Sequence, residues 1–126
     1  MRKAMGFLCL LPVMFAFGVP HANAASCDMM ITAKNESDAS ATLKRVRGKR
    51  ASESWVDFYN GNTSMDSTVY VYTKSVPHGD CKRKHEVWVT FRCANKNNDT
   101  TKIYLELTTN NPPLTKNVIL TTSDCQ

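Results

Sequence analysis

The sequence predicts a small all-β protein: an antiparallel sandwich or barrel of about six or seven strands with two disulfides, following a cleaved signal peptide. Three observations support this prediction. The chain begins with a short basic and apolar leader, and it retains four cysteines beyond that leader. Apolar and polar residues alternate through several short segments that are separated by turn-forming residues.

The leader resembles a secretory signal sequence. Arg2 and Lys3 precede an apolar run over 6–19, and Ala22 and Ala24 supply the small residues that a signal peptidase recognises. The run has about 14 residues, whereas a membrane-spanning helix needs about 20. We therefore predict a signal peptide over 1–24, one domain over 25–126 without a transmembrane segment, and a secreted or periplasmic location.

The cysteines that remain after cleavage form an even set. Removing the leader discards Cys9 and leaves Cys27, Cys81, Cys93 and Cys125. Four cysteines in an exported chain favour two disulfides. The stretch 24–27 also loosely resembles a lipoprotein processing box, but acylation of Cys27 would leave an odd thiol, so a lipoprotein is the weaker alternative.

Strand geometry narrows the disulfide pairing. If residues 85–92 form a straight strand, the length of that strand exceeds the distance that residues 81–85 can span. Cys81 therefore cannot easily reach back to Cys93, and a bond between these two cysteines is disfavoured. Of the two remaining connectivities we favour Cys27 with Cys93, because both share the parity of core residues in their strands. Cys81 would then pair with Cys125.

Period-two alternation predicts the strands in order along the chain. Four are well defined, and their expected core residues are Cys27, Met29, Ile31 and Ala33 in 27–34; Val69 and Val71 in 68–74; Val87, Val89 and Phe91 in 85–93; and Ile103, Leu105 and Leu107 in 102–108. Residues 117–122 predict a fifth strand and residues 54–59 a sixth. Residues 38–50 fit either a helix capped by Asp38 or a strand, and we favour the strand.

Aromatic residues stand opposite the expected core residues of three strands. They are Tyr70, Tyr72, Trp88 and Tyr104. If these strands share a sheet, four rings line one surface, and such a surface suits recognition of glycans or proteins because a ring offers a large contact area at low entropic cost. The alternative is that a second layer, such as residues 38–50, covers the rings as ordinary core.

Basic residues gather in two segments. The first contains Lys44, Arg45, Arg47, Lys49 and Arg50, and the second is Lys82, Arg83 and Lys84. Without Arg2 and Lys3, the 14 remaining basic residues exceed the 11 acidic ones by three. The segments could bind an anionic partner, or they could simply be solvated.

Catalytic and metal-binding patterns are weak in this sequence. His78 and His85, with nearby acidic and basic residues, could serve a nuclease or another hydrolase, but their spacing does not require such a site. The cysteines are best used in disulfides, and two histidines do not complete a metal-ligand set. We therefore predict no catalytic residues, no metal and no cofactor.

These features favour a secreted or periplasmic non-enzymatic binding module over an enzyme. Its expected partner is a glycan, an anionic surface or a protein, as for an inhibitor or a host-interaction factor, bound by the aromatic residues or the first basic segment; nucleic acid is less favoured. The alternatives are a small secreted hydrolase using His78 or His85 and a membrane-active toxin.

Overall fold

The computed structural model describes residues 25–126, and the predicted signal peptide with its cleavage point after Ala24 lies outside them. The all-β prediction is confirmed. The elements are β1 (Ser26–Asn35), β2 (Ala41–Arg50), β3 (Val56–Met65), β4 (Tyr70–Pro77), β5 (His85–Cys93), β6 (Thr100–Leu107), β7 (Leu114–Leu120) and the 3-10 helix η3 (Thr122–Cys125). Residues 41–50 are therefore a strand, as favoured. No helix among residues 25–126 is long and apolar enough to cross a membrane.

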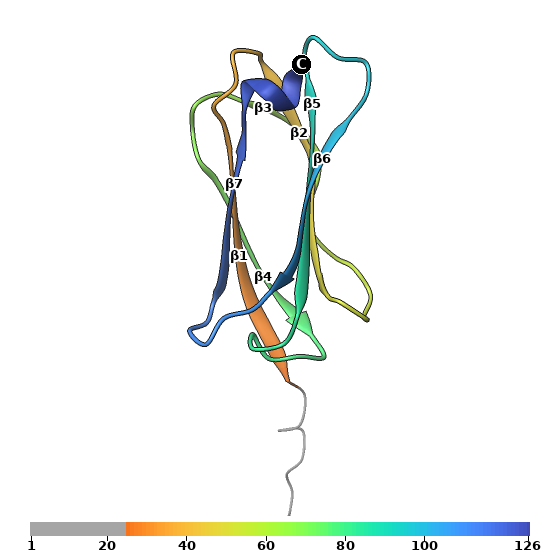
Figure 1. The fold of residues 1–126 in the computed structure, drawn as a ribbon, viewed down its shortest axis with the longest axis vertical. Helices are drawn as coiled ribbons and strands as arrows, with labels where there is room; N and C mark the ends of the chain where they lie inside the picture. Colours follow the sequence, from red (N-terminus) through yellow and green to blue (C-terminus); the bar gives the residue numbers. More distant parts are fainter. Residues whose placement is uncertain (1–24) are drawn as a thin grey trace, which may run out of the picture.

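Two sheets lie face to face and form the sandwich (Figure 1). The three-stranded sheet has the order β4-β1-β7, and the four-stranded sheet has the order β3-β2-β5-β6. All neighbouring strands are antiparallel except β1 and β7, which run parallel with Ile31 opposite Lys116. The expected antiparallel sandwich thus contains one parallel pair.

The core fills the space between the sheets with side chains from the inner face of each. β1 and β5 follow the predicted parity, and both central strands are covered on that face. The largest fully buried apolar side chains are Met29, Ile31, Leu43, Val46, Val76, Val87, Val89, Phe91, Val118 and Leu120. Each side chain of this size stabilises the fold by about 1.5–3 kcal/mol when it is removed from water.

A bulge in β2 determines which of its residues face outward. The register shifts between Leu43 and Arg45 against both neighbouring strands. Lys44 is the extra residue relative to β5, whereas relative to β3 the additional residue lies in β3, between Asn60 and Thr63. Leu43 and Val46 consequently both face the core, although they are three positions apart. The bulge therefore turns Arg45 and Arg47, which lie opposite outward-facing residues of β5, to the outer face of the sheet.

The predicted inward faces of β4 and β6 are wrong. Val69, Val71, Ile103 and Leu105 are 48%, 56%, 49% and 58% exposed, whereas Tyr70, Tyr72 and Tyr104 pack against the core. Both are edge strands with apolar residues at both parities. A tyrosine buries a large ring and still brings its hydroxyl to the wet edge of the sandwich, so it is favoured on the inner side.

An irregularity near the end of β6 restores the predicted orientation of one residue. Glu106 adopts φ 58°, and the register with β5 shifts between the pairs Val87–Tyr104 and His85–Leu107. As a result Tyr104 and Leu107 both pack against the core despite their odd spacing.

The four cysteines form two disulfides as predicted, but the favoured pairing is wrong. The bonds join Cys27 to Cys81 and Cys93 to Cys125. β1, in which Cys27 is the second residue, begins at the end of the sandwich that lies at the bottom of Figure 1, whereas β5, of which Cys93 is the last residue, ends at the opposite end, near the C-terminus. Parity shows which face of its sheet each residue occupies, but it does not show whether two residues lie at the same position along the length of the sandwich. Because Cys27 is in a disulfide, its sulfur is not free to carry a lipid.

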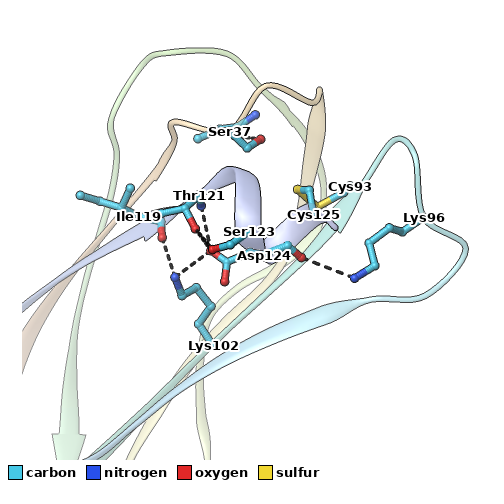
Figure 2. Close-up of polar contacts among 10 residues, drawn as sticks. Ser37, Cys93, Lys96, Lys102, Ile119, Thr121, Ser123, Asp124 and Cys125 are labelled. Carbon is cyan, nitrogen blue, oxygen red and sulfur yellow. Dashed lines mark hydrogen bonds and ion pairs between the residues drawn. A yellow bond between two sulfur atoms is a disulfide. The ribbon is translucent and has the colours of Figure 1, made fainter.

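A polar clasp joins the two sheets along the open side between β6 and β7 (Figure 2). Lys102 faces inward and its Nζ donates to the Ile119 carbonyl and to Asp124 Oδ2, both at 2.8 Å. Asp124 also accepts bonds from the backbone N–H and the hydroxyl of Thr121, which precedes η3. The adjacent disulfide, Cys93–Cys125, attaches η3 to the end of β5.

Candidate binding surface

The basic residues of β2 separate into two locations. Arg45, Arg47 and Lys49 lie opposite Thr90, Trp88 and Glu86 on the outer face of the four-stranded sheet. Lys44, at the bulge, lines a depression on the same face. Arg50 instead lies at the end of the sandwich, where its Nη1 contacts Glu53 Oε1 at 3.2 Å. Four of the five predicted basic residues therefore share one surface.

Asp57 of β3 is the carboxylate that neutralises part of this row. Arg45 donates to it through two bonds of 3.0 and 2.9 Å, and Arg47 Nε lies 3.6 Å from Asp57 Oδ1. The hydrogen bond from Arg45 holds the pKa of Asp57 below its ordinary value and raises that of Arg45. Burial, followed by repulsion from Arg45, lowers the pKa of Arg47.

Lys44 and Lys49 have no acidic partner among residues 25–126. Lys44 donates to the amide oxygen of Asn62, and Lys49 Nζ lies 4.7 Å from the ring centroid of Trp55. The outer face thus retains positive charge that its own carboxylates do not compensate, which favours anionic partners.

Two tryptophans adjoin this cationic row. The rings of Trp55 and Trp88 lie 4.9 Å apart with an interplanar angle of 60°, and Arg47 Cζ lies 4.4 Å from the Trp55 centroid. Trp88 Nε1 donates to Glu86 Oε2 at 2.9 Å. Sequence reasoning missed Trp55, because its place beside β2 depends on the register between β2 and β3, which alternation does not reveal.

An open depression of about 470 Å³ crosses the outer face of the four-stranded sheet. Lys44, Arg45 and Arg47 line it from β2. The neighbouring strands and the loop before β6 add Asn60, Asn62, Trp88, Thr90, Asp99 and Thr101. The depression therefore combines cations, hydrogen-bonding groups and one aromatic ring, a combination suited to a polar ligand with negative charge. We call it the β2–β5 groove.

The four predicted aromatic residues do not form one surface. Trp88 faces outward from the four-stranded sheet, whereas Tyr104, in the same sheet, faces the core between the two sheets. Tyr70 and Tyr72 belong to the three-stranded sheet. Tyr72 packs 5.3 Å from Tyr59 between centroids, and its burial raises the pKa of its hydroxyl. The three tyrosines therefore pack against the core, as the alternative interpretation of the aromatic residues expected. Of the four, only Trp88 belongs to the candidate site.

The two basic segments meet at the end of the sandwich. The Ala51 amide donates to the Lys84 carbonyl, and a hollow of about 340 Å³ is lined by Arg50 and by Lys82, Arg83 and Lys84. Lys84 contacts Glu106 at 2.9 Å, so acidic residues compensate part of this charge.

The two histidines lie in different environments. His85 is fully buried at the start of β5; its Nδ1 lies 2.7 Å from the Arg83 carbonyl, and its Nε2 is buried without a hydrogen-bond partner. His78 is exposed, with φ 71°, directly after β4. Among residues 25–126 no cluster of three potential metal ligands occurs. The histidines therefore show no shared catalytic geometry.

No protein-family model, curated protein or solved structure matches this chain.

Proposed function

We propose that this protein is a non-enzymatic binding module that holds an anionic partner on the outer face of its four-stranded sheet. The observation that carries the proposal is the row formed by Lys44, Arg45, Arg47 and Lys49, to which Asp57 is the one carboxylate bonded among residues 25–126. Such a row attracts anions over a distance of about one Debye length.

The sheet also supports the proposal because it holds these cations in a preorganised arrangement. Two bonds to Asp57 orient Arg45, and the Trp55 ring supports Arg47 and Lys49. Side chains that are ordered before binding lose less conformational entropy when a partner arrives.

An extracytoplasmic location belongs to the same proposal. Disulfides persist mainly in oxidising compartments, and here one of them secures each end of the sandwich. The signal peptide predicted over 1–24 would deliver the chain to such a compartment.

A hydrolase using His85 is a weaker candidate. The imidazole has no access to a substrate while β5 stays in place, because the ring is fully buried. Incubating the protein with RNA and DNA tests this alternative. Cleavage that disappears in the His78→Ala or His85→Ala variant would replace the binding proposal with an enzymatic one.

The binding proposal is tested with heparin, a polyanion, immobilised on a sensor surface. We expect the double variant Lys44→Glu/Lys49→Glu to bind about tenfold or more weakly than the native protein, and native affinity to fall steeply between about 50 and 200 mM salt. The matched control, Lys34→Glu/Lys116→Glu, makes the same change in net charge on the three-stranded sheet, away from both basic segments, and should retain affinity within about threefold. Equal losses in both variants, or no binding by the native protein, would contradict the proposal.

A further inference from the structure

The β2–β5 groove contains groups that a simple polyanion site does not need. Besides its cations it offers two amides, two hydroxyls and a carboxylate from Asn60, Asn62, Thr90, Thr101 and Asp99. A site for bare phosphate or sulfate gains little from amide oxygens and loses affinity to a carboxylate, because both present negative charge to the anion. The ligand that fits this lining therefore carries hydrogen-bond donors as well as negative charge.

Trp88 adds a flat apolar wall at the same place. The indole lines the groove beside Thr90 and lies opposite Arg47, and its Nε1 is already bonded to Glu86. This bond restrains the indole ring of Trp88. A sugar in the pyranose form has an apolar C–H face, and its edge carries hydroxyls that both donate and accept hydrogen bonds. Such a sugar can stack on an indole while its hydroxyls are hydrogen-bonded to neighbouring groups.

Several lining groups are oriented before a ligand arrives. The hydroxyls of Thr90 and Thr101 lie 3.0 Å apart, Arg92 Nε donates to Asp99 Oδ1 at 2.8 Å, and Lys44 donates to Asn62. The groove therefore presents hydroxyls, an acidic acceptor and cations from adjacent strands in one restrained arrangement.

Other occupants fit this lining less well. A nucleic acid strand is held largely by stacking successive bases on several aromatic rings, and Trp88 is the one aromatic ring in the lining of this groove. A protein partner would use aliphatic contacts; the exposed Ile103 lies opposite Trp88 on β6, but neither Ile103 nor Leu105 contributes to the groove lining.

We infer that the β2–β5 groove binds an acidic oligosaccharide. One sugar ring stacks on Trp88, the hydroxyls bond to the threonines, amides and Asp99, and a carboxylate or sulfate group is held by Lys44 and Arg45. This inference rests on the proposed function, since it assigns the anionic partner of the same face to one chemical class.

The test compares defined probes by calorimetry and by the indole N–H signal of Trp88 in NMR titrations. The probes are a heparin-derived tetrasaccharide, the neutral cellotetraose, inorganic tripolyphosphate and a single-stranded oligonucleotide. We expect the tetrasaccharide to bind most tightly and to shift the Trp88 signal. We expect Trp88→Ala to weaken it about tenfold while changing tripolyphosphate affinity less than about twofold.

Two further variants keep the test valid if Trp88→Ala rearranges the sheet. Thr101→Val retains the side-chain shape but removes a groove hydroxyl, and we expect about threefold weaker tetrasaccharide binding. Thr115→Val, on the three-stranded sheet, is the matched control and should leave affinity unchanged.

The outcomes separate this inference from the proposed function. Suppose that Lys44→Glu/Lys49→Glu abolishes polyanion binding, but the native protein binds tetrasaccharide and tripolyphosphate with equal affinity and Trp88→Ala changes neither affinity. The glycan inference is then wrong and the proposed function stands. Preference for the oligonucleotide likewise overturns the glycan inference. If no anionic probe binds, both are wrong.

Discussion

Arg47 is the residue at which the charged and aromatic parts of the outer face meet. Its guanidinium lies over the Trp55 ring, and its Nε is buried without a hydrogen bond, 3.6 Å from Asp57 Oδ1. A desolvated cation of this kind is stabilised by an aromatic face and by a nearby carboxylate. The neighbours of Arg47 therefore contribute to stability as well as to the charge of the surface.

We expect Trp55→Ala to lower the free energy of unfolding by about 2 kcal/mol, because it removes the ring beneath Arg47 and Lys49 and the contact with Trp88. Urea unfolding followed by Trp88 fluorescence measures this change. Trp55→Phe keeps a ring at the position and should lose less than half as much. A loss below about 0.5 kcal/mol in Trp55→Ala would show that the cluster contributes little.

At the scale of elements, the clasp between β6 and η3 bridges the two sheets. The side chains of Lys102 and Asp124 are only 23% and 20% exposed, so solvent screens their ion pair less than it screens pairs such as Lys84–Glu106. Burial by itself raises the pKa of Asp124, but hydrogen bonds from Lys102 and Thr121 together hold it below its ordinary value. The clasp is therefore sensitive to acid.

The sign of this acid sensitivity follows from the lowered pKa of Asp124. The clasp contributes fully above the ordinary carboxyl pKa of about 3.9, and its contribution disappears as the pH falls through the lower pKa of the folded state. We expect Asp124→Asn to cost about 1–2 kcal/mol at pH 7 and to lose less further stability than the native protein between about pH 5 and pH 2. Urea midpoints across that range measure both effects.

A matched control is available for the acid experiment. Asp99→Asn removes a carboxylate from a more exposed pair with Arg92 and should leave the acid dependence close to that of the native protein. If Asp124→Asn follows the native acid curve in parallel, the lowered pKa of Asp124 does not contribute to stability.

At the scale of the whole molecule, the two disulfides restrain opposite ends of the sandwich. The bond between Cys27 and Cys81 spans 54 residues of sequence, and the bond between Cys93 and Cys125 spans 32. Closing loops of these lengths stabilises a fold by about 4 kcal/mol each in the chain-entropy model. Because domains of this size have total stabilities of about 5–15 kcal/mol, the sandwich depends on both bonds.

We expect each paired substitution, Cys27→Ser/Cys81→Ser or Cys93→Ser/Cys125→Ser, to lower the free energy of unfolding by roughly 4 kcal/mol, with the first somewhat more costly. Non-reducing peptide mapping of the native protein should recover one peptide joining Cys27 to Cys81. Recovery of a Cys27–Cys93 peptide would contradict the described connectivity, and unchanged stability in both variants would contradict the entropic argument.

The sequence by itself determined the fold class and most of the strands. Alternation placed Met29 and Ile31 of β1 and Val87 and Val89 of β5 in the core, because most apolar residues of these two central strands share one parity. The even number of cysteines after the predicted signal peptide indicated that all four form disulfides. The run of basic residues over 44–50 was also identified as a candidate binding site from the sequence alone.

Only the tertiary structure decided the remaining features. The edge strands β4 and β6 are apolar at both parities, so the choice of inner face depended on how tyrosines fit against the opposite sheet. The bulge at Lys44 and the register of β3 placed Arg45, Arg47 and Trp55 together. The disulfide pairing depends on which strand ends lie close together at each end of the sandwich. Each of these is a long-range relation between strands, whereas alternation reports only the two faces of one strand.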